Sequence, residues 1–451
     1  MTTPSIAARL DRIPVFSLHR RLAAVVGLGT FFDLYDIFLG GVLAAVLAEP
    51  WDLGTTGKAA VIGSAFAGMF VGALALGTLA DRFGRRTMFL GNLLIYSVFS
   101  LAAAAAPGVE WLVAMRFLAG LGLGAELVIA DTYLSELLPR AARGRYIAWA
   151  YTIGFAGVPV AAFVGGRFVA GEQLLIDGWR WLLIVGGLGA AVIWLLQRSV
   201  PESPRWLQIR GDDDRAEAAT ARIEEAARRE LDLTDLPAPD RSAGASTGRA
   251  GLREVLSPPY RRRSAMLWIF QVLQTVGYYG FGSLAPLVLQ SKGFDVVETL
   301  GYAGLIFLGY PLGSAASIAV VERVERKLLI IGSASTMAAL GIVFGFATAP
   351  AVIVVSGFLL TAASNVFSNG YHIYEAEIFP TRIRATAAGT AYSLSRLTGA
   401  VLPFVSVAIL DGVGASAVFL GSAAILALLC VDVAVLGPRT TGRSLESVSS
   451  G

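Results

Sequence analysis

The sequence predicts an all-α membrane protein, with twelve transmembrane helices arranged as two six-helix bundles in parallel and with both termini in the cytoplasm. Of its 451 residues, 55% are apolar and only 15% are charged, whereas soluble proteins carry about 25% charged residues. Apolar runs of about 20 residues recur along the chain. Two charged motifs also appear twice at one fixed offset, which indicates a duplicated architecture.

Each apolar run is long enough to cross the hydrocarbon core of a bilayer. The predicted spans are residues 22–48, 58–80, 87–106, 110–135, 145–169, 179–198, 264–290, 297–320, 328–347, 350–374, 386–410 and 414–436. Their even number places both termini on one side of the membrane. We expect three segments: an N-terminal bundle (1–200), a cytoplasmic linker with short helices (201–263) and a C-terminal bundle with its tail (264–451).

The basic residues identify the side on which the termini lie. Arginines gather there before the first span, after the fourth span, and at the tail, as Arg9, Arg12, Arg20, Arg21, Arg140, Arg143, Arg145, Arg439 and Arg443. The opposite side carries few basic residues, among them Lys58, Arg167, Arg180 and Lys292. Because cytoplasmic loops are enriched in Lys and Arg, this asymmetry predicts cytoplasmic termini.

The repeat is seen most clearly in the short polar turn between the second and third spans. The turn, residues 77–86, reads G-x-x-x-D-R-x-G-R-R, and the acid-Arg pattern of Asp81 recurs at Glu322, 241 positions later (322 − 81). Glu136 begins an E-x-x-P-x-x-x-R motif that recurs from Glu377 at the same offset. Two motifs at one offset indicate the parallel-repeat plan of a large transporter class.

These charged motifs have two interpretations. The simpler one is a loop that only sets topology, and the sharper one is a gating latch that pairs with a helix end in one conformation and releases it in another. The duplication favours the latch, because each half carries a complete set. The predicted gating residues are Asp81, Arg82, Gly84, Arg85, Arg86, Glu136, Arg143, Glu322, Arg323, Arg326, Glu377 and Arg384.

Charged residues inside the predicted spans are candidates for proton coupling. Asp33 and Asp36 share one face of the first helix, and Arg116 in the fourth span is the obvious countercharge. A countercharge favours the ionised acid and burial favours the neutral one, so a small change can load or unload a proton. We rank Asp36 first, then Asp33, then Glu126. The alternative is that the acids merely lie near the helix end.

A second group of polar residues predicts a substrate site in the C-terminal half. Arg396 lies in the middle of the eleventh span, where a lone guanidinium is costly, so it needs either an acid such as Glu126 or an anionic substrate. Amides and phenols of the seventh and tenth spans can line the same cavity or bond neighbouring helices instead. These residues are Gln271, Gln274, Tyr278, Tyr279, Asn365, Asn369 and Tyr371.

Composition argues against the other function classes. The chain has one cysteine, Cys430, two histidines and no cluster of metal ligands in its sequence, so we expect no metal, no cofactor and no enzymatic activity. The net charge of +3 reflects topology and predicts no nucleic-acid partner. The expected partners are a small-molecule substrate, protons and the lipid bilayer, and the protein is expected to be a monomer.

Together these motifs resemble the major facilitator superfamily over essentially the whole chain. The turn at 77–86, Arg116 with its following glycines, and the segments 201–207 and 438–446 are similar to the signatures of the sugar-porter-like branch. Arg439 departs from that pattern, in which Glu is usual. The Asp33/Asp36 pair, residues 124–126 and residues 278–280 are more similar to bacterial niacin and aromatic-acid transporters, and to the animal organic-ion and synaptic-vesicle transporter-like proteins.

This resemblance implies the function that we expect. In the organic-ion relatives a basic residue at the position of Arg396 goes with anion transport, so the resemblance implies a carrier of anions. We expect a bacterial inner-membrane symporter that takes up a small aromatic carboxylate such as nicotinate with protons, by alternating access of its two bundles. The alternatives are a sugar or organic-cation transporter of the same fold and a non-transporting membrane receptor.

Overall fold

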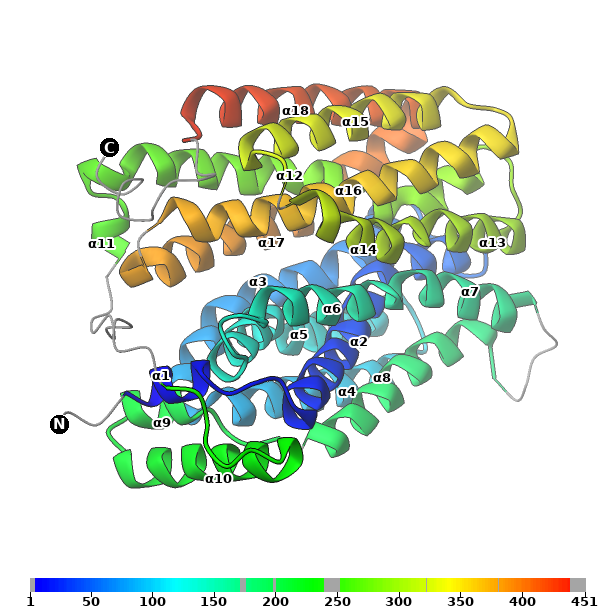
Figure 1. Ribbon diagram of the computed structural model, residues 1–451. Helices are drawn as coiled ribbons and strands as arrows, with labels where there is room; N and C mark the ends of the chain where they lie inside the picture. The colour runs from blue at the N-terminus through cyan, green and yellow to red at the C-terminus, as the bar shows by residue number, and fades with distance from the viewer. Residues whose placement is uncertain are drawn as a thin grey trace.

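The structure of the protein is a computed structural model that describes residues 5–170, 176–197, 200–238, 252–321, 323–379 and 381–438. Within these ranges every regular element is a helix (Figure 1). Twelve spans in the described residues are long and apolar enough to cross a membrane, which confirms the predicted number. Their positions follow the predicted apolar runs, because long apolar stretches are stable in lipid only when helical.

The helices form two bundles joined by a linker. The first bundle contains α2 (Ser17–Leu47), α3 (Thr55–Phe83), α4 (Arg85–Ala104), α5 (Val109–Leu137), α6 (Arg143–Phe155), α7 (Gly157–Ala170) and α8 (Gly178–Gln197). The second contains α12 (Pro258–Ser291), α13 (Val296–Phe307), α14 (Gly309–Val321), α15 (Arg326–Phe346), α16 (Pro350–Ile378), α17 (Thr381–Gly412) and α18 (Ala415–Leu436). Short helices α1 (Ile6–Asp11), α9 (Pro204–Ile209), α10 (Asp213–Leu231) and α11 (Leu252–Val255) lie outside the spans.

Two of the twelve spans are each built from two helices, and a proline explains each interruption. Helix α6 ends at Phe155, four residues before Pro159, and α13 ends at Phe307, four residues before Pro311. A proline lacks the N–H that would bond the carbonyl four residues earlier, so the regular ladder stops there. The two interrupted spans pack on each other across the halves, α6 against α14 and α7 against α13.

Small residues set the closest helix packing in the first bundle. A side chain at Gly68 or Gly72 of α3 would collide with backbone atoms of α5, and one at Gly120 or Gly124 of α5 would collide with α3. Glycines at this spacing on two facing helices let their backbones approach closely. This contact fixes α5, and with it the buried side chains of Arg116 and Glu126.

The two ends of the molecule differ in how the halves meet. Helices α1, α9 and α10 lie at one end of the molecule, at the lower left of Figure 1, which we call the linker face. At the other end, the opposite face, Lys58 Nζ lies 3.3 Å from Asp411 of the second half, and Thr55 donates a hydrogen bond of 2.7 Å to the same carboxylate. Gln290 also donates to the carbonyl of Ala45 there, at 3.0 Å. The opposite face is therefore closed by contacts between the halves.

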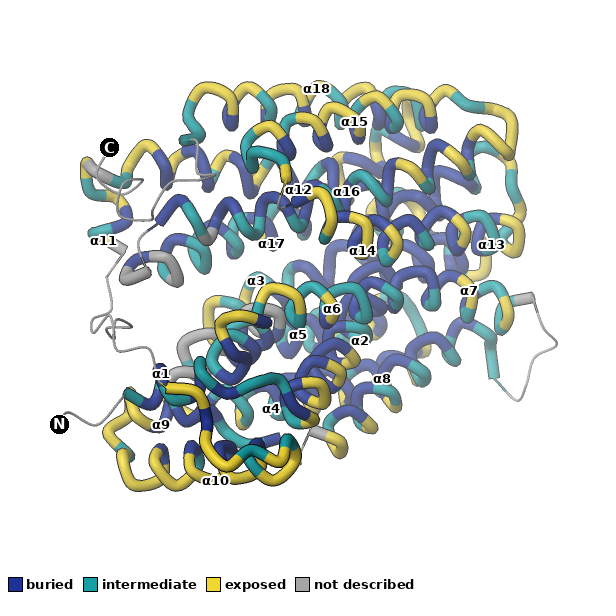
Figure 2. Tube along the Cα trace, viewed as in Figure 1, coloured by how far each residue is buried: buried dark blue, intermediate teal, exposed yellow. Residues whose placement is uncertain are grey.

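Burial follows the arrangement expected of a protein surrounded by lipid. Figure 2 shows buried residues along the helix faces that meet inside the molecule and exposed residues on its periphery. Large apolar side chains such as Leu74, Val98, Val355 and Val435 are about half exposed or more, as lipid-facing positions require. Helices α9 and α10 pack against α1, and α9 also contacts α5; the bounds predicted for the three segments remain a prediction.

Candidate functional site

The first buried charge pair joins α2 to α5. Arg116 Nη1 lies 3.3 Å from Asp36 Oδ1, and each side chain is 1% exposed. Arg116 also donates to two backbone carbonyls, those of Asp36 at 3.2 Å and Val61 at 3.3 Å. The guanidinium is therefore bonded on three sides, and it provides the countercharge that a carboxylate needs inside a span.

A second pair of acids lies beside the first. The carboxyl groups of Asp33 and Glu126 are close enough to interact electrostatically, and both side chains are buried. Among the described residues no group lies within hydrogen-bond distance of their oxygens. Two neighbouring buried carboxyl groups avoid repulsion between like charges when one of them holds a proton. The pair is thus a place where a single proton can be held within the first bundle.

Arg396 is a fully buried base of the second bundle, and the hydroxyls of two tyrosines accept its hydrogen bonds. Its Nη2 donates to the hydroxyl of Tyr279 at 3.0 Å and to the hydroxyl of Tyr392. Its guanidinium carbon lies 4.8 Å and 4.3 Å from the ring centres of the same two tyrosines. Nε and Nη1 have no hydrogen-bond partner, and no carboxylate among the described residues lies within ion-pair distance. Arg396 lies within electrostatic range of Asp33 across the halves.

The polar face predicted for α12 is present, but only part of it reaches Arg396. Gln274 donates to Gln271 at 3.0 Å, and Gln271 donates to Glu375 of α16 at 3.4 Å. Tyr278 packs edge-on against Tyr279, with ring centres 4.8 Å apart. Tyr279 is thus the one α12 residue of the predicted set that the structure joins directly to Arg396.

The three predicted site residues of the tenth span lie in different environments. Asn369 donates to Ser317 of α14 at 2.5 Å, so its amide bonds a neighbouring helix. Tyr371 packs against Phe270, with ring centres 5.3 Å apart. Asn365 is fully buried, and both its amide atoms lack a hydrogen-bond partner within the described chain. Of these three, Asn365 keeps hydrogen-bonding capacity for a ligand.

Three aromatic residues near the buried charges, Tyr392, Tyr151 and His372, were not among the predicted site residues. Tyr392 precedes Arg396 by four positions and shares its helix face, so the helical spacing could have identified it. Tyr151 of α6 donates to Asp131 at 2.9 Å, and its ring lies 6.1 Å from that of His372 in the other half. That contact joins residues 221 positions apart, and no local sequence signal indicates it.

Within the described residues, matching ion pairs between predicted gating residues occur in the two halves. Arg85 lies 3.4 Å from Glu136 in the first half, and Arg326 lies 3.5 Å from Glu377 in the second. The two pairs are related by the same 241-residue offset as the sequence motifs. Each pair lies within its own half, so neither pair joins the two bundles directly.

The other gating residues lie near the turn of one half or the other, or outside the described residues. Gly84 has φ of 104°, a conformation that favours glycine, and turns the chain between α3 and α4. The backbone N–H of Arg86 donates to Glu202 at 3.1 Å, and Arg210 donates to the carbonyl of Arg82 at 2.8 Å. Arg323 continues the turn after α14 through a backbone bond to Val320. Glu322 and the side chains of Asp81 and Arg384 lie outside the described residues.

Comparison with known proteins identifies the family. The model of the family described as sugar (and other) transporter matches residues 22–451. The chain belongs to this family. The transporter is 33% identical over 444 residues to the niacin transporter NiaP of Acinetobacter baylyi, covering 98% of this chain and 99% of the relative. It is 28% identical to the gentisate transporter of Corynebacterium glutamicum, over 92% and 87% of the two chains.

Solved structures show the same fold. The partially occluded inward open conformation of the xylose transporter XylE from E. coli superimposes with a TM-score of 0.75, at 22% sequence identity, covering 95% of this chain and all of the other. This likeness confirms the major facilitator architecture with its two six-helix bundles. The protein is therefore a multi-pass transporter of the inner membrane, and its family consists of transporters, not enzymes.

Proposed function

We propose that the transporter takes up a small aromatic carboxylate such as nicotinate together with protons, as a monomer that alternates access between the two sides of the membrane. The observation that carries the proposal is the state of Arg396, which is fully buried between the halves with Nε and Nη1 unbonded. A carboxylate that reaches Nε or Nη1 gains a charge-assisted hydrogen bond, and it becomes bidentate when it also takes the place of a phenol on Nη2, because each fork of the guanidinium includes Nη2. A buried guanidinium without a carboxylate partner is otherwise unfavourable.

The surroundings of Arg396 suit an aromatic anion. Tyr279 and Tyr392 place their rings against the guanidinium and Tyr371 lies within its electrostatic range, so the region offers both ring faces and hydroxyls. Two relatives are named for niacin and for gentisate, both of which are aromatic carboxylates. An organic cation is disfavoured here because the base would repel it.

The proton is assigned to the acids of the first bundle. Asp36 has its countercharge in Arg116, whereas Asp33 and Glu126 have no base within ion-pair distance among the described residues. Because Arg396 is within electrostatic range of Asp33, an anion that binds Arg396 weakens the positive field on that carboxyl. Protonation of one of the acids Asp36, Asp33 and Glu126 then restores the balance of charge, which links substrate binding to proton binding.

The direction of access follows from the proposed topology. The positive-inside pattern of the sequence makes the linker face cytoplasmic. On that assignment, the Lys58–Asp411 pair closes the outer side in this structure. Opening of the outer side, binding at the centre and reclosure would complete one uptake step.

The test is uptake of labelled nicotinate into proteoliposomes with an imposed pH gradient. We expect accumulation that collapses with the gradient, together with competition by benzoate-type anions and weaker competition by nicotinamide. Competition by xylose or by an organic cation in place of the carboxylates would refute the substrate assignment. Accumulation that ignores the pH gradient would refute the proton assignment.

A further inference from the structure

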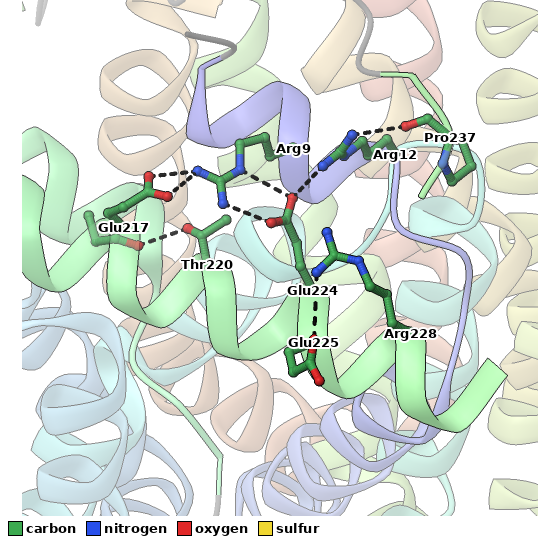
Figure 3. Close-up of polar contacts among 9 residues, drawn as sticks. Arg9, Arg12, Glu217, Thr220, Glu224, Glu225, Arg228 and Pro237 are labelled. Carbon is green, nitrogen blue, oxygen red and sulfur yellow. Dashed lines mark hydrogen bonds and ion pairs between the residues drawn. The ribbon is translucent and has the colours of Figure 1, made fainter. Parts of the chain in front are cut away.

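Helix α1 lies against the linker helix α10 through an arginine clamp. Ile6, Ala8 and Leu10 of α1 are buried, and Arg9 lies on its polar side. Arg9 Nη1 is 2.6 Å from Glu217, and the same guanidinium contacts Glu224 twice, through Nη2 at 2.7 Å and Nε at 3.1 Å (Figure 3). The two-nitrogen contact with Glu224 fixes the orientation of Arg9 as well as its distance.

A second arginine completes the clamp. Arg12 Nη2 is 2.7 Å from Glu224, and its Nη1 donates to the carbonyl of Pro237 at 3.1 Å (Figure 3). Burial of Glu224 alone would raise the pKa of its carboxyl, but the hydrogen bonds from Arg9 and Arg12 outweigh burial and lower that pKa. The bond to Glu224 likewise raises the pKa of Arg9. The clamp is therefore fully charged at neutral pH.

The clamp holds the chain on both sides of Asp11. The carboxylate Oδ1 of Asp11 accepts from Arg143 at 2.8 Å and from Arg205 at 2.8 Å. Arg9 and Arg12, which precede and follow Asp11, both bind α10. The carboxylate of Asp11 therefore faces the bundle. One carboxylate oxygen thus binds two arginines that come from separate parts of the chain.

These two arginines belong to the two segments that hold the turn between α3 and α4. Arg143 follows the α5 end that carries Glu136, the partner of Arg85 at 3.4 Å. Arg205 follows Glu202, which accepts the backbone N–H at position 86 at 3.1 Å. Asp11 therefore joins both supports of the turn at the linker face.

We propose that Asp11 is a positioning residue for the transport cycle, through which the N-terminal helix α1 and the linker helix α10 hold the gating turn of the first half in place. The sequence repeat does not provide an equivalent, since the position 241 residues after Asp11 is Leu252. This role of Asp11 is thus specific to the first half. The proposal rests on the transport function of the protein, but it does not depend on which substrate is carried.

The expected effect follows from what the turn must do. When the linker face closes, the end of the first bundle that carries the turn has to dock against the second bundle. A loosened turn docks less well, so Asp11→Asn disfavours the state that is open at the opposite face. Slower cycling follows, with a lower maximal rate and a nearly unchanged KM.

The equilibrium between the state open at the linker face and the state open at the opposite face can be measured without a substrate. Ser283 is buried against Gly41 of the other half, on the side closed by Lys58 and Asp411. Ser283→Cys in a Cys430→Ala background of the full-length protein is labelled with a maleimide in proteoliposomes, in parallel with uptake. We expect labelling to be about fivefold slower in Asp11→Asn, restored in Asp11→Glu, and slowed in Glu224→Gln, which loosens the clamp while keeping Asp11.

The matched control is Asp214→Asn, which removes an exposed carboxylate of α10 and is expected to leave labelling unchanged. Equal labelling and equal maximal uptake in Asp11→Asn, Glu224→Gln and the parent would overturn the proposal, as would an equal response in Asp214→Asn. If Asp11→Asn does not fold, Glu224→Gln decides the outcome. A labelling response in a protein that does not accumulate nicotinate would support the positioning role of Asp11 and count against the substrate assignment alone.

Discussion

Lys58 and Asp411 form an ion pair of 3.3 Å that joins the beginning of α3 to the end of α17, and so connects the two halves at the opposite face. Both side chains keep some exposure, 21% and 32%. Pairs of this kind contribute about 0.2–1 kcal/mol and weaken as salt rises. Breaking the pair is therefore a mild way to favour the outward-open state.

We predict that Asp411→Asn speeds maleimide labelling of Ser283→Cys by up to about fivefold, because the closed state loses one of its contacts between the halves. The difference from the parent should shrink in high salt, which screens the pair in the parent as well. Asp177→Asn is the control, since its partner Arg180 lies three residues away in the same half. An effect of the same size in that control would show that the loss of any acid, and not the link between the halves, is responsible.

We predict that Arg396→Lys weakens nicotinate strongly, by about tenfold or more, and nicotinamide only slightly. A lysine keeps the charge but cannot offer two parallel N–H donors to a carboxylate. Binding is measured by competition against labelled nicotinate. Tyr392→Phe, which keeps the ring and removes one phenol partner, should affect both ligands alike. Equal losses for both ligands in Arg396→Lys would mean that Arg396 serves only the structure, and a wild-type preference for organic cations would end the anion proposal.

We predict that Asp36→Asn abolishes accumulation driven by a pH gradient and leaves exchange of labelled for unlabelled substrate measurable. A neutral amide cannot load a proton, but it preserves the volume of the side chain. Asp33→Asn and Glu126→Gln are expected to behave similarly because they remove the carboxyl pair. Gradient-driven accumulation that persists in all three single variants would place the coupling elsewhere.

The gating motifs are tested by neutralising one acid in each half. Asp81→Asn shifts the population toward the inward-open state and slows cycling, and combination with Glu322→Gln should slow it further. Glu136→Gln and Glu377→Gln remove the acids of the two ion pairs within the halves and are also expected to slow cycling. The measurement is the maximal rate of uptake. Unchanged transport in the Asp81→Asn and Glu322→Gln double variant would contradict the latch interpretation.

The clamp on α10 gives a prediction with a defined sign in pH. The pKa of Glu224 is lowered in the folded protein from its ordinary value of 4.5, so its contribution to stability is present above that value and is lost as pH falls through the folded value. Glu224→Gln should therefore make the linker more sensitive to protease at pH 7, and this difference should diminish as the pH falls below 4.5 and through the folded pKa of Glu224. A difference that is independent of pH would show that the carboxylate charge does not stabilise the clamp.

The membrane architecture could be predicted from the sequence because the signals for it are local and occur in both halves. Runs of apolar residues determined the spans, and the 241-residue offset related Arg85 and Glu136 to Arg326 and Glu377. The same reasoning placed Arg396 inside a span. Its phenol partners followed less directly: Tyr279 was expected in the cavity, while Tyr392 was overlooked although it lies one helical turn away.

Contacts between distant segments were not predictable from the sequence. Arg9 and Arg12 were interpreted only as markers of topology, yet they bind α10 more than 200 positions later. Asn369 had the composition of a ligand-binding residue, but it bonds Ser317. An amide or guanidinium is compatible with many partners, and only the packing of whole helices selects among them.

Tyr279 contacts both Arg396 of the second half and aromatic rings of the first half. Its hydroxyl bonds Arg396 at 3.0 Å, while its ring lies 6.4 Å from that of Phe38 and 5.5 Å from that of Phe66, both in the first half. A ligand that takes the place of this hydroxyl on Arg396 must move the ring, and the ring cannot move without disturbing its neighbours across the bundle interface. A ligand bound to Arg396 in the way that we propose would therefore act on Phe38 and Phe66 of the first half through the ring of Tyr279.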